Sequence, residues 1–336
     1  MNSNNFLFFM ILIMSTFISI SSNSWLGCWV GLEINLLSFI PLISKASNLL
    51  SSEAALKYFL IQSMASANLI FIILLMFMLN KNFIQLNNMF TILMNSTLMM
   101  KMGLVPFHFW FPQVMEGLSW MNSFILMTWQ KITPMILLSY YYNYNYIIII
   151  IIITALISAI SGLNQSSLRK LMSFSSINHL SWMISAILIS ENLWMFYFII
   201  YSIINMTLCM MLYMMNTYYF NQFFFLKMNF MIKFMLFLNL LSLGGLPPFL
   251  GFINKWMVIN YLIQNNLYIM TFMLIMSALI TLYFYTRLTY SVFLIYYSKF
   301  KFMKFYINNN MMLYLMIMSF FSLNTLIFST MLTYMY

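Results

Sequence analysis

Five side chains that could exchange protons lie inside segments that are otherwise apolar enough to span a bilayer. They are Glu33, Lys101, Lys131, His179 and Lys255. A charge at the bilayer centre costs roughly 2.5–3.5 kcal/mol on insertion scales, so such residues normally face a bundle interior or a wet cavity and mark proton or ion pathways. Counted along each helix at a rise of about 1.5 Å per residue, several of them lie at a similar depth in the membrane. We therefore predict a polar file across separate helices. The plainer alternative, for any one of them, is a hydrogen bond inside the bundle.

Two of these segments also contain residues that interrupt regular helices. Pro106 follows one lysine in the first segment, and the second carries Gly244, Gly245, Pro247 and Pro248 close to another lysine. Proline removes a backbone donor and clashes with the preceding turn, which predicts two broken helices. Unwound backbone at membrane depth survives only where protein or water satisfies its polar groups. We expect both breaks to line a cavity, although a simple proline kink is the alternative for either one.

Composition places the chain among polytopic membrane proteins. It is 64% hydrophobic and only 5% charged, whereas soluble domains carry roughly 25% charged residues. The formal net charge is +10, but the basic residues are scattered between apolar spans, which argues against a nucleic-acid partner. Cys28 and Cys209 lie far apart in apolar stretches, which fits neither a disulfide framework nor a metal site.

Eleven stretches are long enough to cross about 30 Å of hydrocarbon at roughly 20 residues each. The expected spans are 6–22, 25–43, 54–79, 90–118, 121–142, 146–163, 168–189, 192–216, 231–262, 267–296 and 311–334. We expect an all-α polytopic membrane protein with a single transmembrane domain over 1–336. Interruptions in both halves suggest repeat architecture, with a first half at about 25–142, a second at about 146–296 and a C-terminal helix at about 311–334.

Coding bias bears on location. The sequence has 37 methionines and abundant Phe, Ile, Tyr and Asn, with no aspartate and only two arginines, Arg169 and Arg287. This skew is typical of an AT-rich organelle genome in which an extra codon is read as Met. We therefore expect a mitochondrially encoded, multi-pass membrane protein.

The motifs, in their order and spacing, resemble those of the mitochondrial NADH-ubiquinone oxidoreductase chain 2 family, the antiporter-like membrane subunits of respiratory complex I. The matching stretches cover nearly the whole chain and are 24–35, 52–58, 101–110, 129–134, 168–171, 175–179 and 244–256. The resemblance implies an antiporter-like inverted-repeat fold that is shortened at the N-terminus. It also implies a core membrane-arm subunit that carries protons while other subunits transfer electrons.

The resemblance also assigns roles to individual residues. It implies that Glu33 is the family's membrane glutamate and that His179 is the histidine of its central axis. It also implies that Lys131 is the central lysine, and that Lys101 and Lys255 are the lysines of the first and second broken helices. Two departures from the pattern stand out: Ser181 replaces a glycine after the histidine, and Gln113 and Glu116 are exchanged. For Glu116 we therefore favour a helix-end charge over a role in transport.

The sequence and the resemblance also lead to expectations about cofactors and partners. The chain has no nucleotide-binding glycine fingerprint and no cysteine cluster for an iron–sulfur centre. We expect no cofactor or metal in this chain, since NADH, FMN, iron–sulfur clusters and ubiquinone would be used by other subunits of the complex. The resemblance implies chains 4 and 4L as neighbours, together with accessory subunits and bilayer lipid, including cardiolipin.

Two rival functions remain open at this point. A cation/proton antiporter could use the same lysines, but a sodium site would need more oxygen ligands at one depth than Glu33 provides. A purely structural spacer would need no charges at depth, and it would show a dry, fully packed axis around Lys101 and Lys131.

Overall fold

The computed structural model describes residues 3–44, 48–79, 84–227, 230–295, 303–304, 316 and 319–320. Two compact units divide the chain, residues 1–150 and 151–336. We describe each unit by itself.

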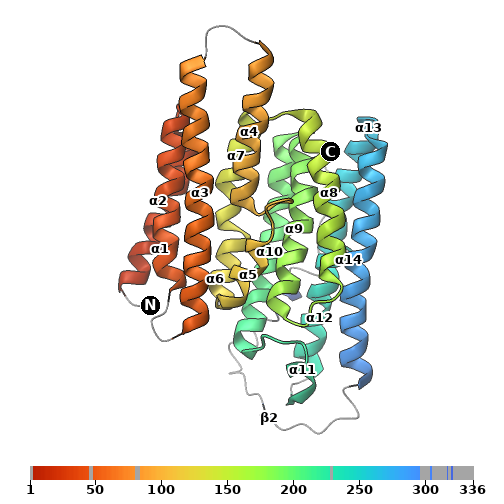
Figure 1. The fold of residues 1–336 in the computed structure, drawn as a ribbon. Coiled ribbons are helices and arrows are strands. Elements are labelled where there is room, and N and C mark those ends of the chain that lie inside the picture. The colour runs from red at the N-terminus through yellow and green to blue at the C-terminus, as the bar shows by residue number, and fades with distance from the viewer. Residues whose placement is uncertain are drawn as a thin grey trace. The chain divides into compact units, whose positions relative to one another are not determined.

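The first unit is a bundle of helices (Figure 1). Its helices are α1 (Ser3–Ser21), α2 (Trp25–Ile43), α3 (Leu49–Leu79), α4 (Ile84–Met102), α5 (Trp110–Gly117), α6 (Trp120–Met127) and α7 (Trp129–Tyr140). Helices α1 and α2 lie side by side, α3 packs on α2, α4 and α5, and α4 packs on α7. Helix α8 (Tyr144–Gly162) begins in this unit and continues into the next.

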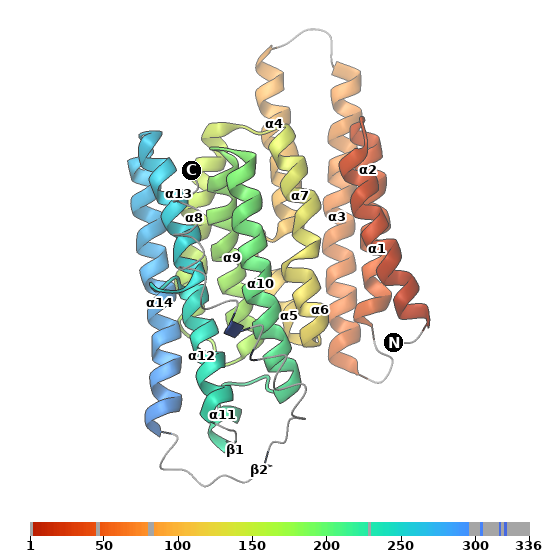
Figure 2. The same ribbon diagram turned by 180° about the vertical axis from the view of Figure 1, so that it is seen from behind.

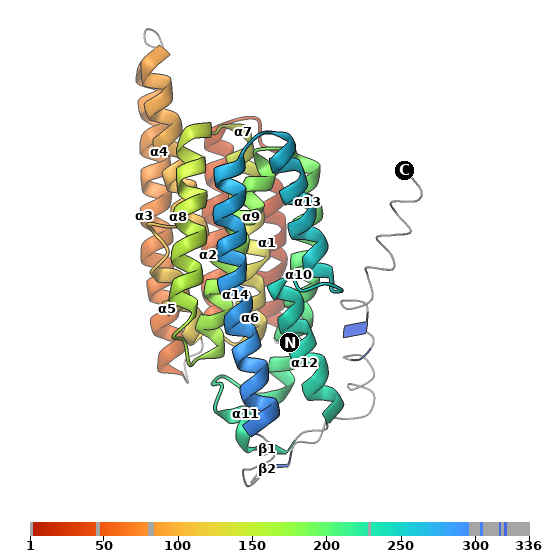
Figure 3. The same ribbon diagram turned by 90° about the vertical axis from the view of Figure 1, so that its right-hand side faces the viewer.

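The second unit is also mainly helical. Its elements are α9 (Leu168–Ile187), α10 (Glu191–Met215), α11 (Gln222–Phe225), β1 (Leu226–Lys227), α12 (Phe230–Gly244), α13 (Leu250–Gln264), α14 (Tyr268–Ile295) and β2 (Met303–Lys304). Helix α10 packs on α9, α12 and α13 (Figure 2), and α14 packs on α12 and α13 (Figure 3). The strands form one short parallel pair, with Leu226 opposite Met303.

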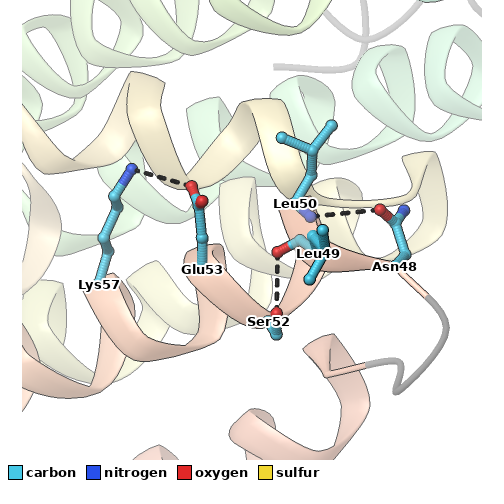
Figure 4. Close-up of polar contacts among 6 residues, drawn as sticks. All are labelled: Asn48, Leu49, Leu50, Ser52, Glu53 and Lys57. Atoms are coloured by element: carbon cyan, nitrogen blue, oxygen red, sulfur yellow. Dashed lines mark hydrogen bonds and ion pairs between the residues drawn. The ribbon is translucent and has the colours of Figure 1, made fainter.

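Helix ends follow local sequence signals. Ser24 caps α2 by accepting a hydrogen bond from the Gly27 amide, and Ser190 caps α10 by accepting one from Leu193. Helix α10 ends at Asn216, which adopts a left-handed conformation with φ of 50°. At the start of α3, the Asn48 side-chain oxygen accepts a hydrogen bond from the Leu50 amide, as Figure 4 shows.

Helix α9 is the polar centre of the second unit. Residues 171–187 are all buried, so this helix needs no apolar outer surface. Its serine hydroxyls each donate to the carbonyl three residues earlier, over 2.6–2.8 Å. They are Ser173, Ser175, Ser176, Ser181 and Ser185. These bonds satisfy the hydroxyls within the helix and explain how a serine-rich segment can occupy a buried position.

The predicted spans agree with the structure in most places. Within the described residues, six helices are each long and apolar enough to cross a membrane, namely α1, α2, α3, α8, α10 and α14. The predicted span 25–43 coincides with α2, and both predicted breaks are present, between α4 and α5 and between α12 and α13. The predicted helix 311–334 lies almost entirely outside the described residues.

One further interruption was not predicted. The span predicted at 121–142 is divided at Thr128, which separates α6 from α7 with φ of −116° and ψ of −73°. The Thr128 hydroxyl donates to the Phe124 carbonyl over 2.7 Å. The Thr128 amide donates to the same carbonyl over 3.0 Å, so this helical hydrogen bond is kept at the interruption, which has no glycine or proline at the position itself.

Candidate functional site: two broken helices and buried lysines

The first break follows Lys101 directly. Helix α4 ends at Met102, and Gly103 adopts φ of +77°, a left-handed conformation that glycine accepts without strain. The amides of Gly103 and Leu104 both donate to the Met99 carbonyl, over 3.0 and 3.1 Å. This is a helix C-terminal turn of the kind that glycine promotes, and it places Lys101 in the last turn of α4.

Side chains satisfy the carbonyls that the first break would leave without partners. The indole nitrogen of Trp110 donates to the Met100 carbonyl over 3.2 Å, and the Gln62 amide donates to the Lys101 carbonyl over 3.1 Å. The break is therefore held by protein donors from α5 and α3, as unwound backbone at membrane depth requires. Pro106 itself is exposed in the connecting segment and does not line the cavity described next.

A small cavity lies beside the first break, inside the first unit. Its volume is about 20 Å³ for water-sized occupants, which exceeds the ~10–15 Å³ that one water needs. Six helices, α2 to α7, contribute to its wall. The polar lining residues are Asn35, Tyr58, Gln62, Lys101, Gln130, Lys131 and Thr133. Lys101 and Lys131 thus line one cavity that is large enough for a water.

Lys131 is the most deeply buried of the predicted lysines. Only 1% of its surface is exposed, and its Nζ lies 5.1 Å from the centroid of the Phe111 ring. An aromatic face at this distance attracts a cation. The ring comes from α5, directly after the first break, and so links the central lysine to the broken helix.

Glu33 does not belong to the wall of this cavity. It is partly exposed, and α2 contributes Leu32, Asn35 and Leu36 to that wall. Glu33 acts electrostatically on Lys101 and on Tyr58. In the part of the chain that the structure describes, however, Glu33 and Lys101 are not within the 4.0 Å of an ion pair. Their interaction is therefore one of charges at a distance.

The second break belongs to the second unit and repeats features of the first. Helix α12 ends at Gly244, and Gly245 adopts φ of +82°. The Gly245 amide donates to the Leu241 carbonyl over 3.1 Å. Pro247 and Pro248 follow in an exposed turn before α13 begins at Leu250.

Lys255 reaches back to this break from α13. Its Nζ donates to the Gly244 carbonyl over 2.7 Å and lies 5.9 Å from the centroid of the Trp182 ring on α9. A side chain on Gly245 would collide with Lys255, since a Cβ there would lie 2.9 Å from its Cδ. The glycine thus permits both the turn and the approach of the lysine.

His179 is connected to the Lys255 region through Tyr197. The Nδ1 of His179 and the Tyr197 hydroxyl are 2.9 Å apart, and the backbone carbonyl of Tyr197 accepts from the Asn254 amide over 3.4 Å. Asn254 precedes Lys255 on α13. The ring of Tyr201, one turn further along α10, lies tilted against the histidine ring, with ring centroids 5.0 Å apart.

The structure therefore groups the predicted residues by unit. Lys101 and Lys131 line one cavity in the first unit. In the second unit His179 is linked through Tyr197 to Asn254, the residue before Lys255. Glu116 lies in the last turn of α5 and is not a lining residue. Sequence reasoning missed the uncharged members, which are Asn35, Tyr58, Gln62, Gln130 and Tyr197. A partial signal existed, because Tyr58 and Gln62 are four residues apart and share one face of α3.

Metal binding has no support in the described residues, where no group of three or more His, Cys, Asp or Glu side chains could hold an ion.

Comparison with known proteins identifies the family. A family model described as NADH:quinone oxidoreductase/Mrp antiporter, TM, matches residues 22–281. NADH-ubiquinone oxidoreductase chain 2 of Anopheles gambiae is 54% identical over 297 residues, which is 87% of this chain and 86% of that protein. The chain belongs to the NADH-ubiquinone oxidoreductase chain 2 family. Chain 2 of Locusta migratoria is 46% identical over 86% of this chain and 85% of that protein.

Solved structures agree with chain 2 membership at the level of fold. A chain of respiratory complex I from Thermus thermophilus superposes with a TM-score of 0.83 at 19% identity, covering 96% of this chain and 78% of that one. A chain of the Mrp complex from Dietzia gives a TM-score of 0.74 at 16% identity, covering 84% of this chain and 59% of that one. The expected family and the all-α, antiporter-like membrane fold are thus confirmed, and this chain 2 member is a subunit of NADH-ubiquinone oxidoreductase.

Proposed function

We propose that this subunit carries protons across the mitochondrial inner membrane through Glu33, Lys101, Lys131, His179 and Lys255, coupled to electron transfer in other subunits. The observation that carries the proposal is the water-sized polar cavity that Lys101 and Lys131 share. Two buried lysines on one such cavity can exchange protons through water, whereas a structural spacer would have no use for them. The two units act together as one translocating domain in this proposal.

The free energy that changes in protonation can supply in such a relay is comparable with the cost of moving a charge across the membrane. Moving one charge against a membrane potential costs about 2.3 kcal/mol per 100 mV. Changes in nearby charge alter the protonation of a buried group by up to several factors of ten, each worth about 1.4 kcal/mol. Glu33 acts on Lys101 at a distance. A change in the position or protonation of Glu33 could therefore load or unload Lys101.

In the second unit, His179 and Lys255 are the proposed carriers. Tyr197 holds the histidine ring through its hydroxyl, and Lys255 is anchored on the second break. In the proposed cycle a proton passes from Lys101 to Lys131 and then toward His179 and Lys255. The break carbonyl of Gly244 would stabilise the charged form of Lys255 when it holds the proton.

The genetic origin, the neighbouring subunits and lipids, and the cofactor content of the chain are also part of this proposal. We propose that the chain is mitochondrially encoded, that chains 4 and 4L are adjacent, and that cardiolipin and accessory subunits surround it. We further propose that the chain holds no cofactor, so that NADH, FMN, iron–sulfur clusters and ubiquinone act in other subunits. The names of the relatives support a respiratory enzyme, and two of the structural neighbours are titled as respiratory complexes.

The direct test is proton pumping by the intact oxidoreductase that carries Lys131→Met. Methionine keeps much of the side-chain volume and removes the ionisable group. We expect NADH oxidation to continue with fewer protons moved per NADH. The matched control is Lys57→Met, because Lys57 is exposed and pairs with Glu53 across 3.7 Å at the start of α3 (Figure 4). An unchanged proton yield with Lys131→Met would remove the central lysine from the route.

A further inference from the structure

Asn35 presents an unsatisfied amide to the cavity of the first unit. Its side chain is 2% exposed, and within the described residues neither Nδ2 nor Oδ1 has a hydrogen-bond partner in the protein. Leaving a buried polar group without a partner costs roughly 1–3 kcal/mol. Where such a group lines a cavity, as Asn35 does, a small polar occupant would remove this cost.

The position of Asn35 on α2 directs it to that cavity. Leu32, Asn35 and Leu36 are spaced as one helical face, and all three line the cavity. Glu33 is two residues from Asn35 and points to another face, so it is not a lining residue. Asn35 is thus the polar group through which α2 acts on the cavity.

A second amide donor lies on the same cavity. The Tyr58 hydroxyl donates to Oε1 of Gln130 over 3.4 Å, which fixes the orientation of that amide. Nε2 of Gln130 is buried and, among the described residues, has no hydrogen-bond partner in the protein. The cavity therefore offers one acceptor and two donors from amides alone, and a buried water needs two to four such partners.

We infer that Asn35 and Gln130 hold one ordered water in the cavity that Lys101 and Lys131 line, and that this water passes the proton between the two lysines. The inference rests on the proposed function. The volume of about 20 Å³ admits roughly one water and excludes larger ligands. A bare cation is disfavoured by the two lysines on the same wall.

The proposed step balances in protons. The Lys101 ammonium gives a proton to the water oxygen while the same water gives one of its own protons to the neutral amine of Lys131. One N–H bond breaks at Lys101, one forms at Lys131, and the water is regenerated. Asn35 acts as a positioning residue here, because it orients the water and exchanges no proton itself.

The test combines water density with pumping in the intact NADH-ubiquinone oxidoreductase. Electron cryomicroscopy at a resolution that reveals ordered waters should show one water within hydrogen-bond distance of the Asn35 amide. Asn35→Leu has similar volume and no polar atoms, so we expect it to lose this water and to lower the protons moved per NADH as much as Lys131→Met does. Asn35→Ser keeps a hydroxyl and should restore both.

The control is Asn95→Leu. Asn95 on α4 is fully buried, and both its amide atoms likewise lack protein partners in the described part of the chain, but it does not line the cavity. We expect it to keep the wild-type proton yield.

Three outcomes would overturn the inference: no water at Asn35 in the wild-type protein, a full proton yield in Asn35→Leu, or an equal loss in Asn95→Leu. If the complex that carries Asn35→Leu does not assemble, two results still test the inference. They are the presence of the water in the wild-type protein and the number of protons moved per NADH by the Asn35→Ser variant. Failure of the proposed function would instead appear as a full yield in Lys131→Met.

Discussion

The Lys255 ammonium donates to the Gly244 carbonyl over 2.7 Å, so the lysine of the second break is bound to the backbone that the break exposes. In the first break the carbonyls of Met100 and Lys101, in the last turn of α4, accept hydrogen bonds from Trp110 and Gln62. Lys101 lines the cavity of the first unit, whereas the Lys255 ammonium donates to the backbone at its own break. The two breaks look alike in sequence but treat their lysines differently.

Lys255→Met should loosen the second break. A hydrogen bond to a charged group contributes about 1.5–3 kcal/mol, and losing even 1.4 kcal/mol would raise local opening about tenfold. Hydrogen–deuterium exchange of segment 241–249 in the intact complex should therefore be faster by about that factor. Lys57→Met is the control, because an exposed ion pair contributes only about 0.2–1 kcal/mol. Unaltered exchange in the Lys255 variant would contradict a structural role for this bond.

Gly245→Ala should be more harmful than Gly244→Ala. Gly245 combines φ of +82° with a Cβ position 2.9 Å from Lys255, whereas a Cβ at Gly244 would meet Tyr285 at 3.3 Å in an ordinary helical residue. A left-handed non-glycine residue costs about 1–2 kcal/mol before any collision. We expect lower yields of assembled complex for Gly245→Ala than for Gly244→Ala, measured by native electrophoresis. Equal yields would mean that the turn tolerates a side chain.

Tyr197→Phe removes the hydroxyl that contacts Nδ1 of His179 and leaves the backbone carbonyl that Asn254 uses. We expect a loss of about 0.5–1.5 kcal/mol in stability, together with a lower proton yield because the histidine ring is less fixed. Tyr213→Phe on the same helix is the matched control, since Tyr213 is 46% exposed. Thermal inactivation and pumping of the two variants can be compared side by side. A proton yield that is equal in both variants would leave Tyr197 with a packing role only.

The breaks could be predicted from the sequence because proline and glycine mark them locally. Gly103, Pro106, Gly245 and Pro247 act through backbone geometry that needs no tertiary context. The interruption at Thr128 was missed because threonine is common inside membrane helices, and only the structure shows its hydroxyl on a backbone carbonyl.

The charged members of the site could be predicted because a charge at membrane depth is conspicuous in any hydrophobic segment. Asn35 and Gln130 carry no charge, and their importance depends on which neighbours leave their amides without partners. The side of α2 on which Glu33 lies could not be predicted for a related reason. Depth along a helix can be counted from sequence, whereas the direction in which α2 presents Glu33 depends on how that helix packs.

Glu33→Gln provides the test of electrostatic action without contact. Because Glu33 acts on Lys101 but forms no ion pair with it in the described residues, removing the charge should alter proton transfer more than stability. A group coupled only at a distance contributes little to packing, so we expect thermal inactivation close to that of the wild type. The proton yield per NADH should fall, since the charge that we propose to switch Lys101 would be absent. Glu53→Gln, which breaks the exposed pair with Lys57, should change neither quantity appreciably. The opposite result would be a Glu33→Gln enzyme with a normal proton yield and a lowered thermal stability. It would show that Glu33 acts through structure, and it would contradict the proposed switching role.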